Sequence, residues 1–97
     1  MDGNERKRVA ARVTGRVQGV GFRHFTRQTA QQIGASGWVR NEPDGSVKLE
    51  VEGTTDQVNQ LMKAVASGPR SARVDKVETT EQDPQGADER FRVRYHR

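Results

Sequence analysis

The order in which apolar residues change their spacing is the feature that most constrains how this chain can fold. In some segments they alternate with polar residues, which is typical of strands with one buried face, and in others they recur every three or four residues, as in amphipathic helices. The alternating segments are residues 9–13, 38–41, 47–51 and 74–77, and the helical ones are 22–33 and 54–66. The pattern predicts strand, helix, strand, strand, helix and strand, with a short extra strand at 91–95.

This order indicates an α+β fold. It is the split β-α-β arrangement of ferredoxin-like α/β sandwiches. Each predicted helix has one apolar stripe and each strand one apolar face, so we expect an antiparallel sheet with both helices on one face. The stretch Glu42-Pro43-Asp44-Gly45 predicts the turn of a hairpin, and Thr54 with Gln57 resembles a capping box at a helix start.

Length and composition limit the function classes. With 97 residues we expect one domain at residues 9–97 after a flexible leader at 1–8. There is no cysteine, which excludes disulfides and thiolate metal sites. No apolar run is long enough for a signal peptide or a membrane span, so a cytoplasmic protein without a membrane partner is expected. The net charge of +4 favours anionic ligands, although a modest positive charge also serves solubility alone.

A glycine-rich stretch, GRVQGVGFR at residues 15–23, joins the first predicted strand to the first helix. Amides at a helix start have no partner within the helix, and glycines let several of them point at one spot. Together with the fork-shaped guanidinium of Arg23, they can hold a phosphate-sized dianion. The alternative is a tight turn with a solvated arginine. The stretch lacks the lysine of nucleotide-binding loops and any acidic residue for magnesium, so we expect no metal and no cofactor.

A second stretch, GWVRN at residues 37–41, ends on an asparagine before the predicted turn. Asn41 either caps that turn or, since the second strand returns beside the glycine-rich loop, lies near Arg23 and hydrogen-bonds a water. His24 follows Arg23, but one residue along a helix turns by about 100°, so we expect it to face solvent, away from what Arg23 contacts.

Both stretches resemble the two signatures of the acylphosphatase family. The similarity runs from about Val9 to the FRVRY segment at 91–95, nearly the whole chain. The resemblance implies the fold described above and hydrolysis of the carboxyl–phosphate bond of acyl phosphates to carboxylate and inorganic phosphate. It implies that Asn41 positions the attacking water. It also implies that the phosphoryl group is bound by Arg23 and by the backbone of Gln18, Gly19, Val20, Gly21 and Phe22.

The implied partners are a small-molecule acyl phosphate and inorganic phosphate as product and inhibitor, with the protein acting as a monomer. Two other classes stay open: a phosphate- or carbamoyl-phosphate-binding accessory module of a larger enzyme, and an RNA-binding domain of the same fold. The chain ends soon after the last predicted strand, which favours a free-standing enzyme.

RNA binding by this fold needs aromatic residues on the exposed sheet face. We expect Trp38 and the phenylalanines in the core instead. The outward positions of the predicted strands are of mixed charge, namely Arg12, Lys48, Glu50, Glu52, Arg92 and Arg94. The sequence therefore predicts no nucleic-acid partner.

Overall fold

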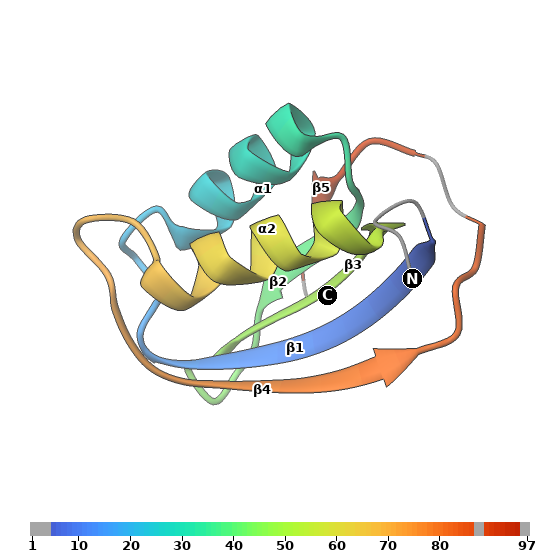
Figure 1. The fold of residues 1–97 in the computed structure, drawn as a ribbon. Helices are drawn as coiled ribbons and strands as arrows, with labels where there is room; N and C mark the ends of the chain where they lie inside the picture. Colours follow the sequence, from blue (N-terminus) through green and yellow to red (C-terminus); the bar gives the residue numbers. More distant parts are fainter. Residues whose placement is uncertain (1–4, 87–88, 96–97) are drawn as a thin grey trace.

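The computed structural model describes residues 5–86 and 89–95, and in them two helices cover one face of a five-stranded sheet (Figure 1). The elements in chain order are β1 (Arg6–Arg16), α1 (Phe22–Ile33), β2 (Ser36–Asn41), β3 (Val47–Thr54), α2 (Thr55–Ser67), β4 (Arg73–Gln82) and β5 (Arg92–Val93). The predicted element order and the placement of both helices on one face are confirmed.

The strands are arranged in the order β4-β1-β3-β2-β5. The first four pair antiparallel, with Val9 opposite Val51 and Val39 opposite Leu49. The expected antiparallel sheet is therefore confirmed for these four strands, whereas the short extra strand, β5, pairs parallel to β2 and makes the sheet mixed at this edge. The reason is topological: β4 lies at one edge, and the chain then crosses to the opposite edge and enters beside β2 in the same direction (Figure 1).

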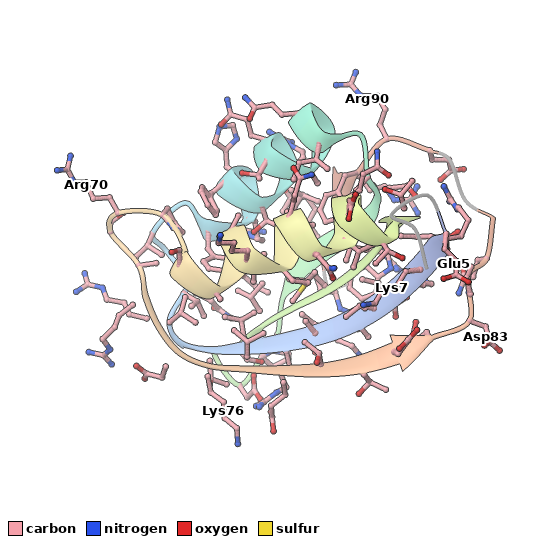
Figure 2. All side chains as sticks on the ribbon, viewed as in Figure 1. Glu5, Lys7, Arg70, Lys76, Asp83 and Arg90 are labelled. Atoms are coloured by element: carbon pink, nitrogen blue, oxygen red, sulfur yellow. The ribbon has the colours of Figure 1, made fainter. Side chains whose placement is uncertain are left out.

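The core lies between the sheet and the helices. From α1, Phe22, Thr26 and Ala30 are buried, and from α2, Val58, Leu61 and Val65. Thr26 is tolerated there because its hydroxyl donates to the carbonyl of Phe22 at 2.9 Å. Charged side chains extend outward, as Figure 2 shows for Arg70, Lys76 and Arg90.

The ends of the helices follow the local signals of the sequence. The capping box of α2 is present: the Gln57 amide donates to the Thr54 hydroxyl at 3.1 Å, and the Thr54 amide donates to the Gln57 side chain at 2.8 Å. Helix α1 ends at Ile33 and is capped by Gly34, whose φ of 92° is a left-handed value that glycine adopts without strain.

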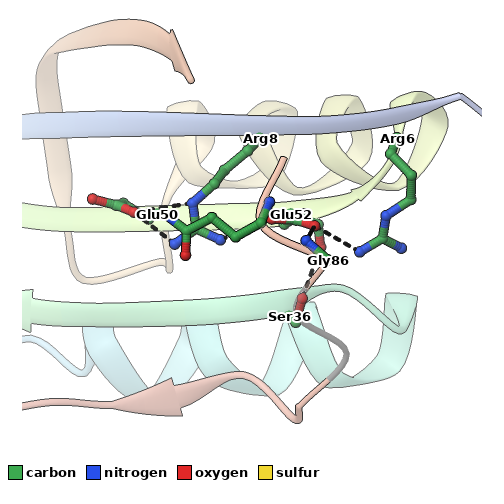
Figure 3. Close-up of polar contacts among 7 residues, drawn as sticks. Arg6, Arg8, Ser36, Glu50, Glu52 and Gly86 are labelled. Atoms are coloured by element: carbon green, nitrogen blue, oxygen red, sulfur yellow. Dashed lines mark hydrogen bonds and ion pairs between the residues drawn. The ribbon is translucent and has the colours of Figure 1, made fainter. Parts of the chain in front are cut away.

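The N-terminal boundary and one strand position differ from the predictions. β1 already begins at Arg6 and Arg8 is buried, so residues 6–8 are part of the sheet rather than of a flexible leader; residues 1–4 lie outside the described part. Glu52, expected to point outward, is fully buried (Figure 3). It lies beneath the segment that crosses from β4 to β5.

Several donors surround the Glu52 carboxylate. Arg6 donates at 2.9 Å and Arg8 at 3.1 Å, and the amides of Gln85 and Gly86 each donate at 2.8 Å. Arg8 also pairs with Glu50 at 2.6 Å. Burial alone would raise the pKa of Glu52, but the Gln85 amide, both guanidinium groups and the Gly86 amide outweigh it and lower the pKa to about 2.

Trp38 is buried, but not in the core that the sequence predicts for it. Its neighbour Val39 belongs to the core cluster, and adjacent strand residues face opposite sides of a sheet. Trp38 therefore lies on the helix-free face, where the guanidinium groups of Arg40 and Arg94 stack on its ring at 4.9 and 4.8 Å from the centroid.

Candidate active site

The loop between β1 and α1 brings backbone amides to the start of a helix. Gly19 and Gly21 have φ values of 73° and 78°, and a side chain at either position would meet open space, so glycine is needed there for its backbone conformation. Gly21 is the N-cap of α1, and no side chain within the described residues caps this end. The first-turn amides and the helix dipole thus favour an anion at this point.

A hollow of about 200 Å³ lies in front of this helix start. It is lined by Val17, Gly19, Gly21, Phe22, Arg23, His24, Arg27, Asn41, Val93 and Tyr95. The loop, the first turns of α1, the end of β2 and the C-terminal strand each form part of its wall. The structure therefore brings the two sequence motifs, the glycine-rich loop and the end of β2, to one place.

Arg23 lies on this hollow in the first turn of α1. Its guanidinium carbon lies 5.2 Å from the centroid of the Tyr95 ring, a cation–π contact. Across residues 5–86 and 89–95 it has no carboxylate partner, which leaves the guanidinium available to an anionic ligand.

Asn41 lines the same hollow from the last position of β2. Its Oδ1 atom is buried and accepts no hydrogen bond from any described residue. Buried acceptors are nearly always satisfied, so an orphaned one at the wall of a hollow indicates a ligand or water donor. The structure does not show Asn41 as a simple turn cap, because a capping oxygen would accept a hydrogen bond from a backbone amide.

The side chain of Gln18 connects the glycine-rich loop to the turn after β2. Its amide donates to the carbonyls of Glu42 and Ser46 at 2.9 and 2.8 Å. The turn is held further by Asp44, which accepts from the Ser46 amide at 2.9 Å. The Ser46 hydroxyl, foremost, and Arg12 lower the pKa of Asp44 well below its usual range. The two site-bearing loops are thereby fixed against each other.

The predicted phosphoryl-binding residues separate into two groups. Gly19, Gly21, Phe22 and Arg23 line the hollow. Gln18 and Val20 do not line it. Gln18 braces the loops, and the Val20 carbonyl accepts from the Ser71 hydroxyl at 3.2 Å. Binding of phosphate by the backbone of residues 18–22 stays a prediction.

His24 is exposed, but it does not turn away from the surroundings of Arg23 as expected. It lies on the wall of the same hollow, and its Nδ1 atom is 3.0 Å from Nη2 of Arg27. A rotation of about 100° along the helix does not remove His24 from the hollow, because the hollow is wide enough for both Arg23 and His24 to line it.

Arg27, Val93 and Tyr95 are site residues that sequence reasoning missed. Arg27 was detectable, since residues four apart share a helix face and Arg27 is four after Arg23. Val93 and Tyr95 were not, because their place depends on the parallel pairing of β5 with β2.

No three His, Asp or Glu side chains within the described ranges are grouped so as to hold a metal ion. Neither helix is long and apolar enough to cross a membrane, as far as residues 5–86 and 89–95 go. Fold and site together define a ferredoxin-like α+β domain with a hollow at the start of its first helix, and an arginine without a described carboxylate partner lines this hollow.

Comparison with known proteins gives this class a family. The acylphosphatase family model matches residues 9–93. An acylphosphatase from Salinibacter ruber is 56% identical over 94 residues, covering 97% of this chain and 99% of that protein. One from Rubrobacter xylanophilus is 48% identical over 88 residues, covering 91% and 80%. The crystal structure of acylphosphatase from Bacillus subtilis matches with a TM-score of 0.87 at 34% identity, over 92% of this chain and 99% of that one. The chain belongs to the acylphosphatase family.

Proposed function

We propose that this enzyme hydrolyses the carboxyl–phosphate bond of acyl phosphates by attack of a water positioned by Asn41 on a phosphoryl group held by Arg23 and the loop amides. The observation that carries the proposal is the pairing of two unsatisfied groups in one hollow: the guanidinium of Arg23, without a carboxylate partner, and the buried Oδ1 of Asn41, without a donor, each within the described residues.

The binding step uses backbone and side-chain donors together. The glycine-rich loop offers amides at the start of α1, and Arg23 adds a two-pronged positive donor on the same wall. Such donors stabilise the charge that spreads over the equatorial oxygens during phosphoryl transfer. Inorganic phosphate has the same oxygens, so the product is expected to inhibit by occupying the hollow.

The water needs orientation more than activation. The leaving group is a carboxylate, which is stable without a proton at neutral pH, so the bond breaks without a proton donor. Asn41 Oδ1 can accept one hydrogen of the water and direct its lone pair at phosphorus. The attack then needs neither a general base nor a metal ion, and the proton is released to a phosphate oxygen or to solvent.

Two features separate this function from the alternatives. Trp38 lies on the helix-free face, but two guanidinium groups already stack on its ring, which disfavours base stacking and hence RNA binding. A module that only binds phosphate or carbamoyl phosphate would need Arg23 but would not need an acceptor such as Asn41. The proposed mechanism uses no residue from a second copy, so it is compatible with a monomer, and we further propose a cytoplasmic location.

The test is hydrolysis of benzoyl phosphate by the purified protein with and without a strong chelator. We expect the protein to release one phosphate for each benzoyl phosphate hydrolysed, at a rate that the chelator leaves unchanged. Loss of activity with the chelator and recovery with magnesium would contradict the metal-independent mechanism. Phosphate binding without any turnover would favour the accessory module.

A further inference from the structure

Arg27 is a second cation on the wall of the hollow for which the mechanism above has no use. It is half-buried, and its Nη2 atom lies 3.0 Å from Nδ1 of His24, which orients the guanidinium. Like Arg23, it pairs with no carboxylate in the part of the chain that the structure describes. By contrast, most arginines of the sheet are matched by an acidic residue, as Arg8 is by Glu50 and Glu52.

The position of Arg27 relative to Arg23 indicates how a bound substrate would be oriented along α1. The two residues are four apart on α1 and so lie on the same helix face, slightly more than one turn or about 6 Å apart along the axis. The phosphoryl group is placed at the N-terminal end, where the loop amides and Arg23 meet. A substrate that extends from there along α1 brings the far end of its acyl group to Arg27.

We propose that Arg27 is a specificity-determining residue that binds a second anionic group at the far end of the acyl chain. The enzyme is then selective for acyl phosphates of dicarboxylic type over those with uncharged acyl groups. This inference rests on the proposed function, since it needs the phosphoryl group at Arg23. In succinyl phosphate, the five bonds from phosphorus to the distal carboxyl carbon span roughly 6 Å when extended, similar to the rise of four helical residues.

The in-line geometry of phosphoryl transfer supports this direction. The leaving group departs opposite the attacking water. The water is held by Asn41 on β2, whereas Arg27 belongs to α1, so the two side chains come from different walls of the hollow.

A second hollow of about 300 Å³ lies beside the first and is lined by Arg23, Asn41, Glu42, Pro43, Arg94 and Tyr95. An acyl group there would lie next to the residue proposed to hold the water, whereas the leaving group of an in-line transfer departs on the opposite side. The hollow in front of α1 is therefore the better place for an anionic acyl group.

The experiment compares succinyl phosphate with butyryl phosphate, which has the same number of carbons but a methyl group in place of the carboxylate. In Arg27→Gln, the ratio of kcat/KM for succinyl over butyryl phosphate should fall about tenfold, the size of one charge-assisted hydrogen bond. The loss should be in KM with kcat nearly unchanged, because the contact lies away from the reacting bond. Arg27→Lys should recover part of the ratio, since it keeps the charge but not the fork.

The matched control is Arg70→Gln, which removes an equal charge from a side chain that projects outward from the loop after α2 (Figure 2). It should leave the ratio unchanged. An equal fall in both variants would mean that the net field, not contact with Arg27, selects the substrate, and would overturn the inference. So would an unchanged ratio in a folded Arg27→Gln protein that still hydrolyses butyryl phosphate. If the unmodified protein hydrolyses neither compound, the proposed function itself is wrong.

Discussion

Arginine is used in opposite ways in two regions of this molecule. At the crossover from β4 to β5, Arg8 contacts both Glu50 and Glu52, and Glu52 also accepts from the amides of Gln85 and Gly86 (Figure 3). In the hollow at the start of α1, by contrast, Arg23 and Arg27 have no carboxylate partner anywhere in residues 5–86 and 89–95.

The difference separates stability from function. A charge buried in the fold must be fully matched, because an uncompensated one costs several kcal/mol. A charge that is left unmatched at a hollow contributes little to folding and is free to contact a ligand. Substitutions in the first region should therefore change unfolding, and those in the second should change catalysis.

The largest effect is expected for Arg23→Ala. We expect kcat/KM for benzoyl phosphate to fall about 10³-fold, since a charged donor to the developing charge is lost, and calorimetric phosphate affinity to fall with it. The unfolding free energy should hardly change, because in the described structure the guanidinium contacts only the exposed ring of Tyr95. Arg23→Lys should recover little. Retained phosphate affinity in Arg23→Ala would remove this residue from the anion site.

The next largest effect is expected at the buried carboxylate of Glu52, in the region where arginines are matched by acidic residues. Glu52→Gln should destabilise the fold by about 3 kcal/mol in urea unfolding, because Arg8 is then buried without its full complement of negative charge. Glu78→Gln is the matched control. Glu78 forms an exposed ion pair with Arg12, and its loss should leave the midpoint essentially unchanged. Equal effects of the two substitutions would show that burial does not distinguish these pairs.

The pH dependence of unfolding checks the same carboxylate. The pKa of Glu52 is about 2 in the folded state against an ordinary value of 4.5, so the unfolded chain binds the proton more readily. Its contribution is complete above about pH 4.5 and is lost as the pH falls toward 2, in total about 3 kcal/mol. Glu52→Gln should flatten the stability profile in this window, and an unaltered profile would contradict the assignment.

A smaller effect is expected for Asn41→Ala. Turnover of benzoyl phosphate should fall about 10²-fold, as for a misplaced reactant, while phosphate affinity stays close to that of the unmodified protein. Stability should not fall, because the substitution removes a buried acceptor that lacks a described donor. Asn59→Ala on the exposed face of α2 serves as the control. Near-normal turnover in Asn41→Ala would contradict the proposal that Asn41 positions the attacking water.

Local patterns predicted the parts of the fold that local interactions determine. The alternation at 47–51 and the capping box of Thr54 and Gln57 depend on residues close together in sequence, and both are present. Glu52 follows the same alternation, yet it is buried because residues 85 and 86, more than thirty positions later, cross over it. The pattern within one strand contains no information about that crossing.

The site was predictable to a similar extent. The motifs named Arg23 and Asn41, and the structure places both on one hollow. Their chemical roles stay predictions. Tyr95 could not be foreseen there, since its position depends on which edge of the sheet accepts β5.

The two hydrogen bonds of the Gln18 amide also affect how the site moves. They join the loop before α1 to the turn after β2, so thermal displacement of one carries the other with it. The separation of Arg23 and Asn41 then fluctuates less than the position of either loop. The proposed in-line transfer depends on that separation, so correlated displacement of the two loops would preserve the reactive arrangement. Because the amide is neutral, the coupling adds no charge to the place where the transition state develops its own.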